Sequence, residues 1–359
     1  MADKSDKPEL PKAKTRFTIL PQGMNEKEMG MEVISKIKIF HNDLMTEMQK
    51  VIVGQQEIID LIIIAILCKG NVLLEGVPGL GKTLIFRTLS KVMALSFRHV
   101  QFTPDLMPSD ILGTEIVQQD PVTQQRVLKF LKGPVFCHFL LADEINRTSP
   151  KTQSALLQAM QDREVSVGNV TYKLEAPFFV VATQNPIDQE GVYSLPEAQL
   201  DRFMFNVYID YPTYDEEVQI AQRYTQVYTP EVSEVITQED ILSLQNLVRG
   251  MLISDALLHY AVDLVAATRL SPENPHPFVK QWIAWGAGPR ATLSLVLAAK
   301  ARALLKGRYC VAAEDIRAVA PSILRHRIKL NFSAEAENVK PADVIHRLLE
   351  AVPEQKKRG

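Results

Sequence analysis

The residues with the clearest chemical use form one short run, GVPGLGKT, from Gly76 to Thr83. Glycines at this spacing let a loop turn its backbone N–H groups around phosphates, and Lys82 would place a charge near the β and γ phosphates. The Thr83 hydroxyl could bind Mg²⁺. The run stands between the apolar NVLLE and LIFRTL, the strand-loop-helix order that such a loop requires. The sequence therefore predicts a site for ATP and Mg²⁺, with further contacts from Val77, Pro78, Gly79, Leu80, Gly81 and Leu84.

Polar residues end the next two apolar runs. Asp143 and Glu144 close VFCHFLLADE, where a parallel sheet would present an Asp to Mg²⁺ and a Glu to the attacking water. Gln184 and Asn185 close FFVVATQNP, and their amides could hydrogen-bond the γ-phosphate or that water. The alternatives are an exposed acidic strand end and an ordinary Asn-Pro turn. The order of these groups after the phosphate loop favours ATP hydrolysis.

Alternating helices and strands must position these groups, and the sequence pattern predicts an α/β domain. A parallel sheet flanked by helices is the economical interpretation. Helices are expected at 31–51, 58–69, 83–95 and 152–162, and strands at 71–75, 97–102, 135–142, 178–182 and 205–209.

The pattern becomes almost wholly helical after YPTYDEE, and the first residues show no periodicity. We therefore expect a flexible N-terminal segment over 1–30, a nucleotide-binding α/β domain over 31–212 and an all-helical domain over 213–359. Within the last, helical periods cover 241–248, 254–268, 291–305 and 313–325, with Ser254 and Ala313 near two helix starts.

The composition bears on the class of protein. The chain of 359 residues is 46% hydrophobic and carries a formal charge of -2, so no overall basic field favours nucleic acid. Its three cysteines, Cys68, Cys137 and Cys310, are too far apart for a CxxC metal site. The sequence offers neither a signal-peptide pattern nor a membrane-spanning run, and we expect a cytoplasmic protein.

Five motifs together resemble the MoxR family of AAA+ ATPases: GVPGLGKT, LLADEINR, ATQNP, LPEAQLDRF and GAGPRA, in this order. The resemblance covers most of the chain, from Gly54 to Arg290. It implies a P-loop AAA+ core with a central parallel sheet, followed by an all-α lid domain. VIVGQ resembles the segment that lines the adenine pocket, which implies base contacts from Val53 and Gly54.

The resemblance also implies roles for two arginines. Arg202 matches the arginine finger that one AAA+ subunit inserts into its neighbour's site, and Arg290 matches sensor 2, an arginine that the lid carries to the nucleotide. A surface ion pair and an ordinary first-turn arginine are the alternatives. Gln101 and Arg147 match family positions near the catalytic glutamate and the subunit boundary.

Two insertions have hairpin patterns. TEIVQQ and QRVLKF flank the turn-like DPVT, and VSV and TYKLE flank the pair Gly168-Asn169. The family places these hairpins toward a central pore or the substrate side, and plain surface hairpins are the alternative. Tyr172 is the one aromatic residue that the sequence places near either tip as exposed.

The resulting hypothesis is a homo-oligomeric ATPase, a hexamer by resemblance, that remodels or matures partner protein complexes. Relatives often act on partners with von Willebrand factor A domains. A DNA-acting AAA+ translocase or helicase is the alternative, but only Arg126 and Lys173 flank the hairpin tips. A scaffold that binds ATP without turnover is disfavoured because Glu144, Asn185 and Arg202 are all present.

Overall fold

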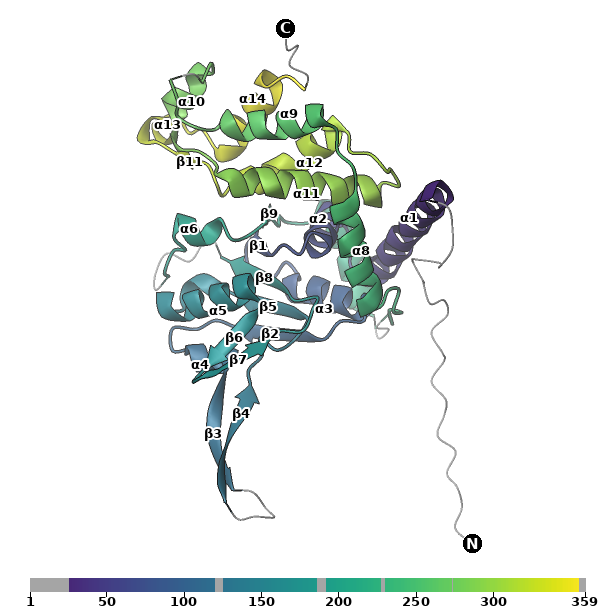
Figure 1. The fold of residues 1–359 in the computed structure, drawn as a ribbon, viewed down its shortest axis with the longest axis vertical. Coiled ribbons are helices and arrows are strands. Elements are labelled where there is room, and N and C mark those ends of the chain that lie inside the picture. Colours follow the sequence, from purple (N-terminus) through teal and green to yellow (C-terminus); the bar gives the residue numbers. More distant parts are fainter. Residues whose placement is uncertain (1–25, 120–124, 186–191, 227–229, 273, 355–359) are drawn as a thin grey trace.

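A parallel sheet of five strands lies at the centre of the α/β part (Figure 1). The computed structural model describes residues 26–119, 125–185, 192–226, 230–272 and 274–354. All four strand pairings in the sheet are parallel, which confirms the predicted fold class. The strand order across the sheet is β2 (Phe97–Gln101), β5 (Phe139–Asp143), β8 (Phe179–Gln184), β1 (Val72–Glu75) and β9 (Phe205–Tyr208).

Successive residues of the central strands face two different hydrophobic cores, because side chains alternate along a strand. Leu141 and Val181 belong to one core, while Leu140 and Val180 belong to the other. Burial on both faces explains why these strands are continuously apolar. The first core includes α1 (Glu26–Val51), α2 (Gln56–Leu67) and α3 (Lys82–Val92), and the second includes α4 (Pro108–Leu112) and α5 (Pro150–Asp162).

Two predicted boundaries were wrong by four or more residues. The strand expected from Val135 begins only at Phe139, since Val135 and Cys137 are buried in turns rather than in the sheet. The helix expected from residue 31 begins at Glu26, so the last residues of the predicted flexible segment are helical. Residues 1–25 lie outside the described part of the chain.

Both insertions form antiparallel hairpins, as predicted. One pairs β3 (Gly113–Gln119) with β4 (Arg126–Lys132) and projects from the α/β part, and the other pairs β6 (Glu164–Val167) with β7 (Val170–Lys173) (Figure 1). The DPVT turn lies outside the described residues.

Tyr172 does not serve as an exposed aromatic at a hairpin tip. Its ring stacks on Phe130 of the other hairpin at 4.3 Å between centroids, and Phe136 meets both rings edge-on. The expectation of an exposed aromatic was therefore wrong, because this residue joins the two hairpins.

The remainder of the chain is helical, as predicted, apart from a two-stranded sheet formed by β10 (Ile283–Trp285) and β11 (Lys329–Leu330). Ser254 caps its helix, and another helix begins at Ala313, as expected. No described helix is long and apolar enough to cross a membrane. The helices are α7 (Tyr214–Tyr224), α8 (Gln238–Gly250), α9 (Asp255–Ala266), α10 (Pro277–Trp282), α11 (Pro289–Leu305), α12 (Ala313–Leu324), α13 (Phe332–Ala336) and α14 (Pro341–Ala351).

Residue 213 does not separate two independent cores. The Tyr224 hydroxyl of α7 donates to Val51 O at 2.5 Å, and Gln245 of α8 donates to Ile66 O at 2.8 Å. The first two helices after the sheet thus pack on α1 and α2, and one apolar cluster continues into α11 and α12. The domain boundaries at 30 and 212 stay predictions.

Candidate active site

The phosphate loop follows β1 and leads into α3, whose N-cap is Gly81. Gly79 and Gly81 have φ values of 88° and 72°, in the left-handed region that favours glycine. A Cβ added at either residue would meet no atom within 4 Å. The backbone therefore needs glycine for its conformation, and open space remains beside it for a ligand.

Lys82 closes the loop onto its own first residue. Its ammonium donates a hydrogen bond to Gly76 O. Partial burial lowers the pKa of Lys82, while the negative charges of Asp143 and Glu144 act in the opposite direction. The acidic strand end therefore lies close enough to act electrostatically on Lys82. An incoming phosphate could accept the hydrogen bond that Gly76 O now accepts.

The carboxylate of Asp143 is oriented by two neighbours that the sequence analysis did not identify. It accepts a hydrogen bond from the Thr183 hydroxyl on β8, and His99 Nε2 on β2 lies 3.2 Å from its other oxygen. Thr183 Oγ1 also accepts from the backbone N–H of Glu144 at 2.9 Å. Both residues are on strands that border β5, so they fix the end of the strand that carries the acids.

Glu144 leaves the strand in a left-handed conformation, with φ 56° and ψ 49°. One carboxylate oxygen accepts from Gln101 Nε2 at 2.8 Å and from Arg147 Nη1 at 2.9 Å. The structure thus places both residues beside the glutamate, as the family resemblance implied for Gln101. Arg147 belongs to the short 3-10 helix η1 (Ile145–Arg147).

Asn185 follows β8 directly and is 9% exposed. The preceding residue, Gln184, accepts a hydrogen bond through its carbonyl from Gly76 N at 3.3 Å. The end of β8 therefore lies against the start of the phosphate loop. This brings Asn185 to the same edge of the sheet as Asp143, because Asp143 ends β5 and Asn185 follows β8, and the two strands are parallel neighbours.

The predicted adenine corner also has a defined backbone. Gly54 and Gln55 have φ values of 67° and 59°, and a Cβ at Gly54 would lie 2.1 Å from a carboxylate oxygen of Glu216. Gln55 Nε2 donates to Asp210 O at 3.4 Å. The corner is therefore packed against the segment that enters α7. Of the other predicted contacts, Val53 and Val77 are half-buried, Pro78 and Leu84 are exposed, Leu80 packs on the core and Thr83 is half-buried in the first turn of α3.

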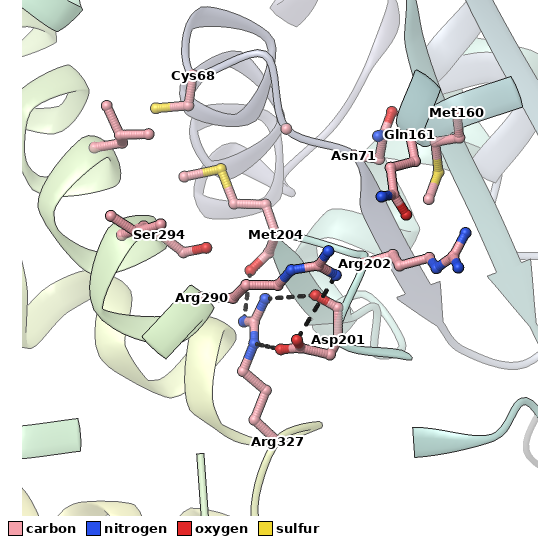
Figure 2. Close-up of a pocket in the computed structure, with 13 residues that line it drawn as sticks. Cys68, Asn71, Met160, Gln161, Asp201, Arg202, Met204, Arg290, Ser294 and Arg327 are labelled. Carbon is pink, nitrogen blue, oxygen red and sulfur yellow. Dashed lines mark hydrogen bonds and ion pairs between the residues drawn. The ribbon is translucent and has the colours of Figure 1, made fainter. Parts of the chain in front are cut away.

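The two arginines lie at the edge of the sheet where the strands begin. The phosphate loop lies at the opposite edge, which is formed by the carboxyl ends of the strands. Arg202 and Arg290 line one pocket of about 240 Å³ with Asn71 and Met204, which immediately precede β1 and β9 (Figure 2). The phosphate loop follows the carboxyl end of β1. The four residues of β1 separate these edges by roughly 13 Å.

Neither arginine contacts the phosphate loop of its own chain. Arg202 Nη1 donates to Leu157 O at 3.2 Å, and Figure 2 shows its side chain pointing away from Asp201. Arg290 Nη1 lies 3.8 Å from an oxygen of Asp201. The structure therefore brings Arg290 together with Arg202 and not with the phosphate loop, although the family resemblance implied that the lid carries Arg290 to the nucleotide.

The residues at the loop edge fit a nucleoside triphosphate with Mg²⁺. The open glycine backbone and Lys82 suit phosphate oxygens, and Asp143 and Thr83 offer oxygen ligands. Mg²⁺ usually takes only one or two protein carboxylates and completes its shell with phosphate and water. In the described part of the chain no cluster of three His, Cys, Asp or Glu residues could hold a metal ion.

His326 next to the pocket gives a prediction for stability. Its Nε2 lies 3.1 Å from Phe203 O, and burial together with nearby Arg327 holds the pKa of the imidazole well below 6.5. As the pH falls, the unfolded chain therefore protonates this imidazole before the folded chain does. The free energy of unfolding should fall as the pH drops below about 6.5, by at most about 1.4 kcal/mol per pH unit. Urea titrations at pH 7.5 and 5.5 should show that His326→Gln loses less free energy of unfolding between these two pH values than the unsubstituted protein does.

The exposed His346 provides the matched control for this experiment. The variant His346→Gln should keep the pH dependence of the unsubstituted protein. Equal pH dependence in His326→Gln and the unsubstituted protein would contradict the assigned direction of the pKa shift.

Comparison with known proteins identifies the family of the chain. Residues 71–205 match the family described as "ATPase family associated with various cellular activities (AAA)", and residues 278–348 match the AAA lid domain. Chaperone MoxR1 of Mycobacterium tuberculosis is 44% identical over 85% of this chain and 80% of its own length. Protein MoxR of Methylorubrum extorquens is 30% identical over 86% and 93% of the two chains.

A solved structure gives the same result for the fold. The crystal structure of a candidate ATPase from Cytophaga hutchinsonii is 41% identical and superposes with a TM-score of 0.85, covering 91% of this chain and 98% of the other. The matching domains, the relatives and the phosphate-loop geometry agree with one another, and the chain belongs to the MoxR family of AAA+ ATPases.

Proposed function

We propose that this ATPase binds ATP with Mg²⁺ at the phosphate-loop edge and hydrolyses it in a site that a neighbouring subunit completes. The observation that carries the proposal is the position of Arg202 and Arg290 at the opposite edge of the sheet from Lys82. These arginines suit dispersed phosphate charge. They would meet such charge only in another subunit.

The groups at the phosphate-loop edge have separate roles in binding the phosphates, holding Mg²⁺ and activating water. Lys82 and the loop N–H groups hold the phosphates, while Thr83 and Asp143 provide oxygen ligands for Mg²⁺, whose charge would neutralise phosphate oxygens. Glu144 accepts a proton from the attacking water, with Gln101 and Arg147 orienting its carboxylate. Asn185 orients that water or the γ-phosphate through a neutral amide.

A subunit with its acceptor site at one edge and its arginines at the other is suited to head-to-tail assembly. Such heterologous contacts close into rings when the rotation between subunits allows it. The proposal therefore includes a homo-oligomer, and a hexamer is the state expected from the family. Arg290 would act on the same neighbouring nucleotide as Arg202, because both arginines line one pocket of this subunit.

The work done by hydrolysis is proposed to be chaperone-like remodelling of a partner protein complex, with a von Willebrand factor A domain protein as one expected kind of client. The Mycobacterium tuberculosis relative carries the name of a chaperone. The projecting hairpin also exposes a cross-strand apolar pair, Val117 and Leu128, at 64% and 70% exposure. Exposed apolar side chains can pack against a partner protein but not against the charged backbone of DNA. We therefore prefer the chaperone-like role to the DNA translocase. The cytoplasmic location stays an expectation from the sequence.

The shared site predicts that activity depends on assembly. ATP turnover per subunit should rise with protein concentration in the range where sedimentation shows subunits associating, while ATP binding to the monomer persists. A preparation that stays strictly monomeric yet hydrolyses ATP at the full rate per subunit would contradict the shared site.

A further inference from the structure

The segment that carries the finger, Asp201–Met204, is held by a side chain of the helical lid. Arg327 donates from Nε to Asp201 Oδ1 at 2.7 Å, and from Nη2 to Asp201 O at 3.2 Å and Phe203 O at 2.7 Å. Nη1 donates to Met204 O at 3.1 Å and to Ile323 O of α12 at 2.6 Å. One guanidinium thus joins the last turn of a lid helix to both sides of Arg202.

The guanidinium in this contact is buried and hydrogen-bonded through all three of its nitrogens. The Arg327 side chain is 2% exposed, and a buried guanidinium is tolerated only when it is paired and hydrogen-bonded. Figure 2 shows Arg327 and Arg290 converging on the carboxylate of Asp201. The same carboxylate therefore orients both the finger segment and the start of α11.

The residues before Arg327 extend the contact along β9. His326 Nε2 lies 3.1 Å from Phe203 O at the amino end of this strand. The guanidinium carbon of Arg325 lies 4.4 Å from the ring centre of Tyr208, the last residue of the strand. Three consecutive residues of the lid therefore contact the segment just before β9 and the last residue of the strand.

The residue that follows the carboxyl end of β9 packs against the start of the phosphate loop. Ile209 N donates to Glu75 O at 2.8 Å, and a Cβ at Gly76 would lie only 2.2 Å from Ile209 Cγ2. The backbone at the start of the loop therefore packs directly against Ile209, with no space between them for a side chain. β9 therefore lies between Ile209, which contacts the start of the phosphate loop, and the segment Asp201–Met204, which carries Arg202.

We propose that Arg325–Arg327 is a coupling clamp, in which Arg327 is the positioning residue for Arg202 and the lid links the occupancy of one phosphate loop to the finger that the same chain presents to its neighbour. The inference rests on the proposed shared site. Arg327 touches no nucleotide in this scheme and acts only through the Asp201–Met204 segment.

The variant Arg327→Lys tests the clamp, because it keeps the charge and loses the planar fork. We expect kcat to fall about 10- to 100-fold, as for a catalytic group displaced by about 1 Å. The KM for ATP and the affinity of the chain's own loop should change little. The matched control is Arg302→Lys, which alters another buried lid pair, 2.6 Å between Arg302 Nη1 and Asp315 Oδ1, away from the finger. This control should lower the melting temperature but keep kcat.

A double-mutant cycle separates positioning from general destabilisation. If Arg327 acts through the finger, Arg202→Ala with Arg327→Lys should be no slower than Arg202→Ala alone. If the two losses in kcat multiply, Arg327 has only a structural role and the clamp is overturned. Asp201→Asn provides a second variant that leaves the backbone acceptors of the segment in place, should Arg327→Lys fold poorly.

The outcomes also distinguish this inference from the proposed function. Unchanged kcat in both Arg327→Lys and Asp201→Asn, beside a slow Arg202→Ala, would overturn the clamp alone. Unchanged kcat in Arg202→Ala, measured where sedimentation shows oligomers, would overturn the shared site and the clamp with it.

Discussion

Arg202→Ala is expected to lower the ATPase rate by about 10³- to 10⁵-fold, the range that arginine fingers contribute in other nucleotide hydrolases. ATP affinity should persist, because the side chain lies at the opposite edge of the sheet from the chain's own phosphate loop. Turnover measured at saturating ATP, together with equilibrium nucleotide binding, checks both parts. Arg223→Ala is the matched control, since Arg223 also donates to backbone carbonyls but lies on α7.

Mixing experiments test where the finger acts. Arg202→Ala subunits keep an intact phosphate loop, and Lys82→Ala subunits keep an intact finger. Mixed oligomers should therefore hydrolyse ATP at sites where the two meet, although each variant alone is slow. Mixed oligomers that form and remain inactive would show that the finger does not act between subunits.

The phosphate loop and the acidic strand end could be predicted from the sequence because each is a contiguous run with local backbone requirements. Gly79 and Gly81 need positive φ, Lys82 starts a helix, and Asp143 ends a buried strand. Chemistry that depends on adjacent residues leaves its pattern in a single stretch of sequence. The main helices and strands were predictable for the same reason, from local periodicity.

The orienting residues of this site were not predicted, because they depend on the register between strands. Thr183 and His99 reach Asp143 from the two strands that border β5, and each appears in the sequence only as a polar residue in an apolar or mixed run. The family resemblance implied that Gln101 lies near Glu144, but the reason, the pairing of Gln101 with Asp143 in the sheet register, is visible only in the fold.

The position of the lid was the least accessible feature. The motif GAGPRA predicted a helix that starts at Pro289 with Arg290 in its first turn, which the structure confirms, but only tertiary packing determines what that helix end faces. Here Asp201 pairs with Arg290 and with Arg327, so the lid is joined to the segment that carries Arg202, the proposed finger. Arg327 itself was missed, since a single arginine after a helix has no local pattern that distinguishes it from a solvated charge.

Glu144→Gln should bind ATP and fail to turn it over, with a rate loss of about 10²- to 10⁴-fold, the contribution typical of a general base. The amide keeps the shape of the side chain and can still accept from Gln101, but it cannot take a proton from water. A single-turnover measurement with prebound ATP separates this loss from a loss of binding. Glu115→Gln on the exposed hairpin strand is the matched control and should hydrolyse ATP normally.

The same variant tests the proposed role as well as the proposed base. A subunit that holds ATP without hydrolysing it should retain a client that the active protein releases, so a partner complex should copurify with Glu144→Gln in ATP and dissociate when ATP is removed. Normal hydrolysis by Glu144→Gln would contradict the assigned base, since Glu144 is the carboxylate that Gln101 and Arg147 hold by hydrogen bonds. Because slow turnover traps the bound state, ATP-dependent retention of a protein complex would support remodelling, and retention of DNA alone would favour the translocase.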